Sequence, residues 1–160
     1  MSDLGRTIGG KYTLTEIIGK GAQGTVYKAT SELGEVAVKE IHPRSAEEWD
    51  NLQRHTQVLR SLPSEINGVH LAHLLDIYVE NEASYLVQPL LSGKDLGRLR
   101  KDKMLEKAEI VDIITSVASA MHELHTRFNI YHRDLKPSSI LCDGEQASIC
   151  DFGVARSASN

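Results

Sequence analysis

The sequence predicts an α+β protein in which a small antiparallel sheet with one helix precedes a mainly helical segment. Over the first 90 or so residues, short runs are rich in apolar and β-branched side chains, which is typical of strands. After residue 90 the apolar residues recur every three or four positions, which indicates an amphipathic helix. Pro89 falls at this change, so the predicted domains are residues 1–89 and residues 90–160.

The first domain is expected to contain a five-stranded antiparallel sheet. Its strands are expected at residues 11–19, 25–30, 35–41, 71–79 and 84–88. Glycines between the first two segments predict a hairpin, and residues 80–82 predict a turn between the last two. Ser45 and Glu48 form the S-x-x-E pattern of a capping box, so the helix is expected to begin there and to end before Pro63.

The second domain is expected to contain one long helix and a short hairpin. Apolar residues at 3.6-residue spacing predict the helix over residues 106–126; they are Ile110, Ile113, Ile114, Val117, Met121 and Leu124. Residues 140–142 and 147–150 flank the turn-prone stretch DGEQ, and this arrangement predicts the hairpin.

Composition narrows the class of protein. The 18 basic and 22 acidic residues give a formal net charge of −4, which does not favour a nucleic-acid partner. No run of about 18 apolar residues is present, and Ser2 stands where N-myristoylation needs glycine, so no membrane association is expected. Cys142 and Cys150 form no C-x-x-C motif, which favours reduced thiols in a cytoplasmic or nuclear protein.

A glycine-rich stretch and a strand lysine are candidates for phosphate binding. The stretch is Gly19-Lys20-Gly21-Ala22-Gln23-Gly24-Thr25-Val26, in which the glycines let backbone N–H groups approach phosphate oxygens. A strand rather than a helix follows it, which disfavours a dinucleotide-binding fold. Lys39 lies in the apolar run VAVK, either as a lysine on an edge strand or as a cation held for phosphate oxygens.

Two further motifs follow in the second domain. HRDLKPSSIL covers residues 132–141, and Asp151-Phe152-Gly153 comes directly after the predicted hairpin. In this order the four motifs resemble those of protein kinases, and the resemblance covers residues 12–156. A lysine two residues after the loop aspartate, here Lys136, resembles the pattern of serine/threonine kinases. The stretches GKGAQGTVYKA and DFGVAR together are similar to NIMA-related and other serine/threonine kinases. Aminoglycoside phosphotransferases also have an H-x-D loop, but the LKP after Asp134 favours protein kinases.

The resemblance implies a protein-kinase-like fold and transfer of the γ-phosphate of ATP, with Mg²⁺, to a protein hydroxyl. The first domain is then the N-lobe, and the second is the first, mainly helical part of the C-lobe. The implied catalytic residues are Asp134, Lys136 and Lys39, and the implied metal ligands are Asp151 and Ser139. The implied nucleotide-binding residues are Ile18, Gly19, Lys20, Gly21, Ala22, Gln23, Gly24, Thr25, Val26, Ala37, Lys39, Gln88, Pro89, Leu91, Asp95 and Leu141.

Three departures from the family pattern leave a second function open. Ser139 stands where kinases have a metal-binding asparagine, and its side chain is shorter. His55 stands where the helix glutamate that pairs with the strand lysine is expected, if Leu59 and Leu62 are the two leucines that follow it. The chain also ends soon after residue 153, whereas a kinase domain needs about 250 residues. We therefore expect either a fragment or a truncated kinase-like protein, and the alternative to an active kinase is a pseudokinase that regulates a partner protein.

Other chemistry is disfavoured by the sequence. His122 and His125 are three residues apart on the predicted helix and could approach one metal ion, but His125 and His132 fall where kinases have structural histidines. His132, Leu59 and Phe152 are expected to pack together in the spine that joins kinase lobes. Cys150 is expected to be a small buried hydrophobe rather than a nucleophile.

Overall fold

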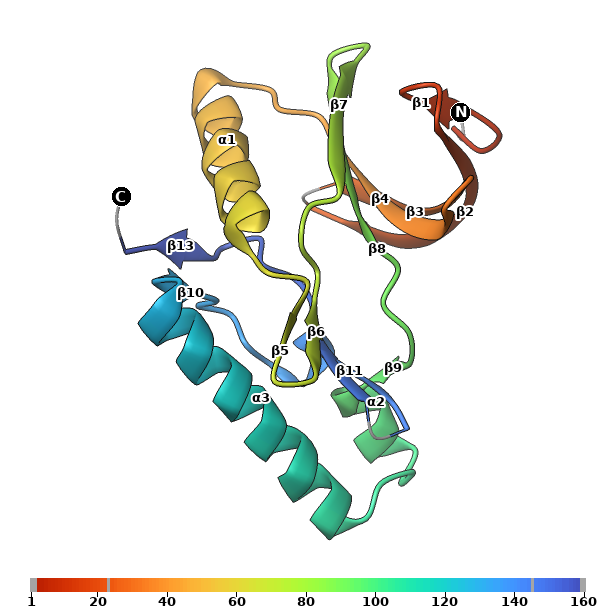
Figure 1. The fold of residues 1–160 in the computed structure, drawn as a ribbon. Helices are drawn as coiled ribbons and strands as arrows, with labels where there is room; N and C mark the ends of the chain where they lie inside the picture. Colours follow the sequence, from red (N-terminus) through yellow and green to blue (C-terminus); the bar gives the residue numbers. More distant parts are fainter. Residues whose placement is uncertain (1–2, 23, 145, 159–160) are drawn as a thin grey trace. The chain divides into compact units, whose positions relative to one another are not determined.

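A computed structural model describes residues 3–22, 24–144 and 146–158 (Figure 1). The chain divides into two units, and each is described by itself. The first unit is Met1–Gln53 with Leu74–Leu90, and the second is Arg54–His73 with Leu91–Asn160. This division differs from the predicted domains at residues 54–73, which pack with the later part of the chain.

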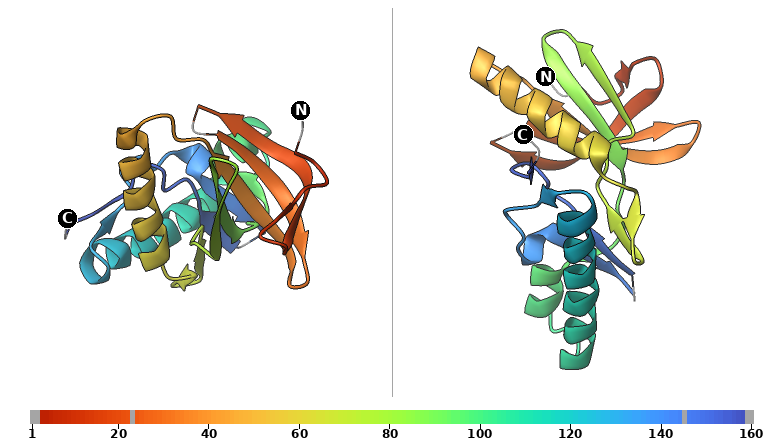
Figure 2. Two further views of the ribbon diagram at one scale, coloured as in Figure 1. Left: turned by 90° about the horizontal axis from the view of Figure 1, so that it is seen from above. Right: turned by 60° about the vertical axis from the view of Figure 1, so that its left-hand side comes forward.

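The first unit is built on an antiparallel sheet whose strands lie side by side in the order β1-β2-β3-β4-β8-β7 (Figure 2). The strands are β1 (Thr7–Ile8), β2 (Tyr12–Gly21), β3 (Gly24–Ser31), β4 (Gly34–Ile41), β7 (Asp76–Glu80) and β8 (Ala83–Pro89). The described sheet thus has six strands rather than five, because the two-residue strand β1 adds to the edge of β2. A run of two residues is too short to give a periodic sequence pattern, so the sequence did not predict β1.

Alternation along the strands separates the two faces of this sheet. On β4, Val36, Val38 and Glu40 are buried, while the residues between them are partly exposed. Successive side chains of a strand point to opposite faces, so one face forms the core of the unit. The core consists of Ile8, Tyr12, Leu14, Tyr27, Ala29, Val36, Val38, Ala83, Tyr85 and Val87.

The predicted strand over residues 71–79 is wrong in its first half. Strand β6 is Val69–Leu71 and belongs to the second unit, where Leu71 pairs with Ile149. Strand β7 begins only at Asp76, after a turn in which the His73 N–H donates to the Leu71 carbonyl. The two ends of this apolar run enter different sheets. Because the run has no break in its sequence pattern, periodicity could not show where one strand ends and the next begins.

Helix α1 (Ala46–Ser61) begins where the capping pattern predicts. The Glu48 N–H donates to Ser45 Oγ at 3.2 Å, and the Glu48 carboxylate accepts from the Arg44 N–H at 2.6 Å. The capping glutamate therefore bonds one residue earlier than in the standard capping box. The helix ends two residues before Pro63, as predicted.

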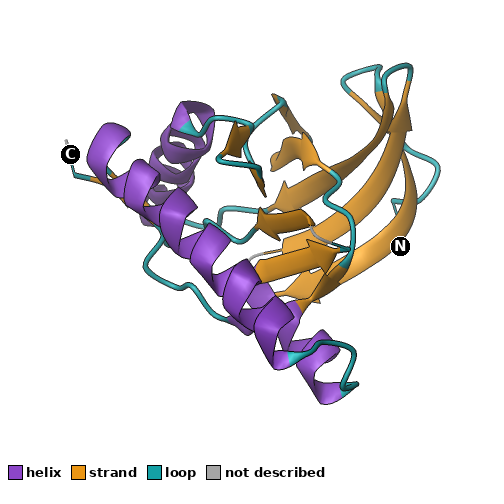
Figure 3. Ribbon diagram, turned by 60° about the horizontal axis from the view of Figure 1, so that its bottom comes forward, coloured by secondary structure: helices purple, strands orange, loops and turns teal. Residues whose placement is uncertain are grey.

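The second unit combines a five-stranded sheet with helices α2 and α3 and the second half of α1 (Figure 3). Its sheet has the order β5-β6-β12-β11-β9. The remaining elements of this unit are β5 (Glu65–Ile66), β9 (Lys94–Asp95), α2 (Leu96–Lys101), α3 (Lys107–Arg127), β10 (Ile130–Tyr131), η1 (Pro137–Ser139), β11 (Ile140–Asp143), β12 (Gln146–Ile149) and β13 (Arg156–Ser157). The predicted hairpin is confirmed as β11 and β12, although Cys150 lies just outside it.

Helix α3 confirms the predicted long helix to within one residue at each end. Glu106 and Glu109 form a reciprocal capping box at its start. Ile113, Val117, Ala120, Met121 and Leu124 are its buried residues, whereas Ile114 is 46% exposed. None of the described helices is long and apolar enough to cross a membrane.

Candidate active site

The glycine-rich stretch forms the end of the β2–β3 hairpin in the first unit. Gly19 pairs with Val26, and Gly21 pairs with Gly24. Gly24 has a φ of 136°, and a Cβ there would overlap the carbonyl oxygen of Glu40, so this position requires glycine for the fold. At Gly21 a Cβ would meet no atom of the described residues within 4 Å, so packing among them does not require this glycine. Gln23 lies outside the described residues.

The strand lysine shares a face of the sheet with other predicted nucleotide-binding residues. Lys39 on β4 pairs with Val26 on β3, and Ala37 pairs with Gln88 on β8. Directly opposed residues of an antiparallel sheet point to the same side. The sheet therefore brings these four residues together on the face opposite the core, and Lys39 is partly exposed there.

The loop after β10 in the second unit holds its aspartate through a buried histidine. His132 is 1% exposed, and its ring lies 4.7 Å from the Phe152 ring, centroid to centroid. The Asp134 N–H donates to His132 Nδ1 at 3.2 Å, and Nε2 lies 2.9 Å from the Cys150 carbonyl oxygen. Because Nδ1 accepts and a carbonyl can only accept, Nε2 carries the proton.

The side chains of this loop that carry charge are accessible. Asp134 and Lys136 are about half-exposed, and Lys136 Nζ donates to Asp134 Oδ2 at 3.2 Å. An exposed pair of this kind adds little stability, so it leaves both groups available to a substrate. Arg133 adopts a φ of 69°, an uncommon conformation for a residue other than glycine. Such backbone conformations concentrate at functional loops.

Asp151 and Phe152 point to different environments. Phe152 is buried against His132, whereas the Asp151 side chain is exposed and its φ is 58°. Burial, and then the negative charge of Asp151, raise the pKa of the preceding Cys150 thiol to about 11. The Cys150 thiol is therefore protonated at neutral pH, which agrees with the prediction that it is not a nucleophile.

Ser139 is fully buried at the end of η1. Its hydroxyl donates to the Asp134 carbonyl at 3.3 Å, and its own carbonyl accepts from the Cys150 N–H at 2.9 Å. The serine thus connects the loop that holds Asp134 to the segment that precedes Asp151.

Two predicted nucleotide-binding residues are neighbours across a strand pair of the second unit. Asp95 on β9 pairs with Leu141 on β11. One carboxylate oxygen of Asp95 accepts from the Arg98 N–H at 2.9 Å and thereby caps helix α2. The other oxygen of Asp95 is not committed to this cap.

The helix positions that depart from the kinase pattern lie in the second half of α1. His55 is buried, as is Leu59, and both belong to the second unit. Lys39 belongs to the first unit, so a pairing between Lys39 and His55 stays a prediction. Glu48, an acidic residue two turns before His55, is exposed and is used in capping the helix.

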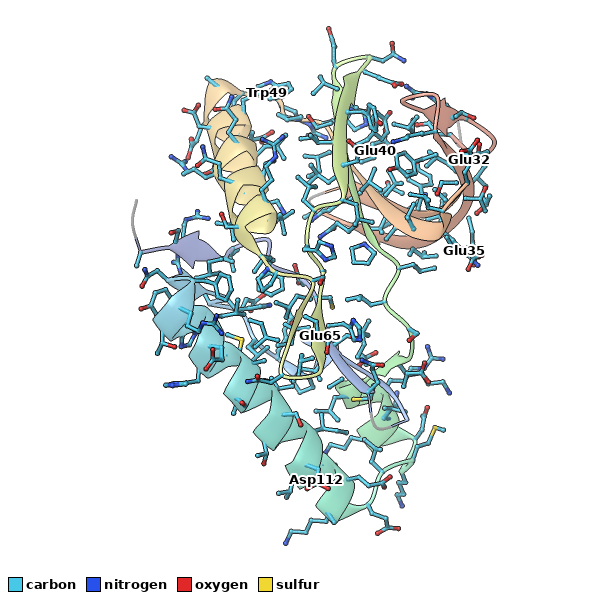
Figure 4. All side chains as sticks on the ribbon, in the orientation of Figure 1. Glu32, Glu35, Glu40, Trp49, Glu65 and Asp112 are labelled. Atoms are coloured by element: carbon cyan, nitrogen blue, oxygen red, sulfur yellow. The ribbon has the colours of Figure 1, made fainter. Side chains whose placement is uncertain are left out.

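A buried carboxylate of the first unit was missed by sequence reasoning. Glu40, labelled in Figure 4, accepts from the Tyr27 hydroxyl at 2.9 Å and lies 2.6 Å from His42 Nε2. The Tyr85 hydroxyl is 3.5 Å from the same carboxylate and accepts from Arg6 at 2.8 Å. Burial, and then the hydrogen bond to Glu40, raise the pKa of Tyr27 to about 12. The signal was available, because Glu40 continues the buried alternation of Val36 and Val38.

The expectation that His122, His125 and His132 hold no metal ion stays a prediction. Among the described residues, no group of three or more histidine, cysteine or acidic side chains is arranged to hold a metal ion. His125 instead stacks on Tyr131, with ring centroids 4.7 Å apart. Cys142 and Cys150 are free thiols.

Comparison with known proteins identifies the family. The model of the protein kinase domain matches residues 12–160, which is nearly the whole chain. The chain belongs to the protein kinase family. Within the family its relatives are of the serine/threonine type, as the lysine after the loop aspartate predicted, whereas the likeness to NIMA-related kinases stays a prediction.

Two relatives illustrate the match. The chain is 34% identical over 154 residues to serine/threonine-protein kinase 36 of Pongo abelii, covering 93% of this chain and 11% of that protein. It is 32% identical over 171 residues to serine/threonine-protein kinase PkaA of Streptomyces coelicolor, covering 96% of this chain and 31% of that protein. The chain therefore spans less than a third of the length of these two relatives.

Proposed function

We propose that the protein transfers the γ-phosphate of ATP to a serine or threonine hydroxyl of another protein. The observation that carries this proposal is the loop aspartate. Asp134 has an accessible carboxylate on a backbone fixed by hydrogen bonds to two buried side chains, His132 and Ser139. To orient a substrate hydroxyl, a carboxylate must be accessible and its backbone must be held in place, because phosphoryl transfer depends mainly on positioning and charge.

The first unit would bind the nucleotide. The hairpin around Gly21 would offer its backbone N–H groups to the phosphates, and packing among the described residues does not require glycine there. Lys39 would contact the α- and β-phosphates, as its place in the VAVK strand implies. Within this unit, Val26 and Ala37 would contact the adenine, the backbone of Pro89 would bond its edge, and Gln88 would be the gatekeeper. The roles of Leu91 and Leu141, which belong to the second unit, stay what the resemblance implies. Asp95 would reach the ribose with the oxygen that does not cap α2.

The second unit would supply the groups at the reacting phosphate. Asp134 would accept or orient the hydroxyl proton of the substrate, and Lys136 would place its positive charge near the γ-phosphate. The hydrogen bond between them keeps both groups on the same side of the loop. The free thiols favour a reducing compartment, which agrees with the proposed cytoplasmic or nuclear location.

The fit of Mg²⁺ to the residues present is partial. Asp151 offers an exposed carboxylate, and Mg²⁺ in kinases is usually held by one or two carboxylates together with phosphate oxygens. When bound, the ion neutralises charge on the transferring phosphoryl group. Ser139, the other predicted ligand, is fully buried, so it does not fit as a direct ligand.

Two observations favour a pseudokinase as the second candidate. Ser139 replaces the metal-binding asparagine, and a buried His55 stands where the helix glutamate is expected. A pseudokinase would bind nucleotide or a partner protein and regulate that partner without transferring phosphate.

One experiment separates the two candidates. The intact protein is incubated with γ-labelled ATP, Mg²⁺ and a mixed protein substrate, and labelled amino acids are identified after hydrolysis. Label on phosphoserine or phosphothreonine supports the kinase. Nucleotide binding without label in the substrate supports the pseudokinase, and label only on phosphotyrosine contradicts the serine/threonine specificity.

A further inference from the structure

The hydroxyl of Ser139 is committed within the loop. Ser139 is 0% exposed, its N–H donates to the Lys136 carbonyl at 2.8 Å, and its hydroxyl donates to the Asp134 carbonyl at 3.3 Å. This bond uses the single hydrogen of the hydroxyl and leaves the lone pairs of its oxygen, so the burial of Ser139 decides whether a metal ion can reach it.

The same serine closes a ring of hydrogen bonds around the loop. Its carbonyl accepts from the Cys150 N–H at 2.9 Å, and the Cys150 carbonyl accepts from His132 Nε2 at 2.9 Å. His132 Nδ1 in turn accepts from the Asp134 N–H at 3.2 Å. The backbone of Asp134 is therefore bonded on both its N–H and its carbonyl, and both bonds lead to Cys150, the residue before Asp151.

The burial of Ser139 also limits what else its hydroxyl can do. A metal ligand must touch the ion, and Mg²⁺ keeps several of its waters, so its protein ligands lie at an accessible surface. Asp151 meets this condition because its side chain is exposed, and Ser139 does not. An asparagine has a longer side chain with separate donor and acceptor atoms, so it can bond within the loop and still reach outward.

We infer that Ser139 is a positioning residue for Asp134 and not a metal ligand, so that the chain holds a single divalent ion, through Asp151. This inference rests on the proposed nucleotide binding of the protein. It assigns the hydroxyl of Ser139 the bond that fixes the loop, in place of the metal contact of the asparagine it replaces.

The test counts metal ions by electron paramagnetic resonance. Mn²⁺ replaces Mg²⁺ in a titration of the intact protein saturated with a non-hydrolysable ATP analogue. We expect one bound Mn²⁺ for each bound nucleotide, with equal Mn²⁺ affinity in Ser139→Ala. Two bound ions in the unmodified protein, or weaker Mn²⁺ binding in Ser139→Ala, would overturn the inference and leave the proposed function standing. If no variant binds nucleotide at all, the proposed function fails together with the inference.

A second readout tests the positioning. In Ser139→Ala the turnover number is expected to fall about 2- to 10-fold, the range that corresponds to one hydrogen bond, with an unchanged KM for ATP. Amide hydrogen exchange of Asp134 is expected to become faster, whereas that of Cys150, which bonds the Ser139 carbonyl, stays slow and shows that the fold is intact. Ser139→Thr keeps the hydroxyl and is expected to retain both the turnover and the protection of Asp134. Unchanged exchange at Asp134 in Ser139→Ala would contradict the positioning role, whatever the activity.

Discussion

Glu40 provides the sharpest test of the first unit, because a buried carboxylate stabilises a fold only when its hydrogen bonds are made. Its side chain is 8% exposed and accepts from the Tyr27 hydroxyl, which lies in the same core. Glu40→Ala removes the acceptor but leaves the Tyr27 hydroxyl buried without a partner. We therefore expect this substitution to lower the free energy of unfolding of the first unit.

The magnitude follows from the contacts. An orphaned buried hydroxyl costs about 1–3 kcal/mol, and the truncated side chain leaves a small cavity that adds to it. The expected total is about 2–4 kcal/mol. For a chain of this length 1 kcal/mol shifts the melting temperature by about 2–4 °C, so the shift should be about 5–15 °C.

The assay is urea unfolding followed by circular dichroism, with three comparison variants. Glu32→Ala, at the exposed turn between β3 and β4, removes the same side chain without burial and should leave stability unchanged. Tyr27→Phe removes the hydroxyl instead, and the double variant Tyr27→Phe/Glu40→Ala should be about 1–2 kcal/mol more stable than the sum of the single effects predicts. A Glu40→Ala protein as stable as the unmodified one, or fully additive effects, would refute the reasoning.

Two further predictions concern the hairpin and the thiol. Gly24→Ala should destabilise the first unit by about 3 kcal/mol or more, because Gly24 has a φ of 136° and an added Cβ would overlap the Glu40 carbonyl. Gly21→Ala should leave stability unchanged and weaken ATP binding. Equal melting temperatures for the two variants would contradict this difference. Alkylation of Cys150 by iodoacetamide at pH 7.5 should be about 100-fold slower than that of an ordinary cysteine, because a pKa of about 11 rather than 9.0 leaves that much less thiolate. The rate should rise until the pH passes 11, and fast alkylation at pH 7.5 in a folded sample would contradict the raised pKa of this partly buried thiol.

The features that the sequence predicted well depend on local chemistry. Most strands of the first unit follow from short runs of apolar and β-branched residues between turns, and the start of α1 follows from the capping side chains of Ser45 and Glu48. Helix α3 was found because its apolar residues recur over 21 positions, which is long enough for the period to be clear. The kinase family followed from the order of four short motifs.

The features that the sequence could not predict depend on distant pairing. Leu71 lies in an apolar run that continues into β7, and only its pairing with Ile149 places it in another sheet. Strand β1 exists because Thr7 and Ile8 pair with the edge of β2, not because of their own propensity. The burial of Ser139 and its bond to Asp134 likewise depend on how the loop folds back, whereas the resemblance to protein kinases implied a metal ligand there.

The central claim is that the protein transfers phosphate and that Asp134 accepts or orients the proton of the substrate hydroxyl. The most direct test compares the transfer rates of the intact protein and its Asp134→Asn variant. The variant keeps the shape of the side chain and the backbone bonds to His132 and Ser139, so the loop should keep its fold. With saturating ATP and Mg²⁺ and one protein substrate, we expect the unmodified protein to transfer label and the variant to be slower by about 100-fold or more, with equal ATP affinity. Equal rates in the two proteins, or no transfer by the unmodified protein, would contradict the claim.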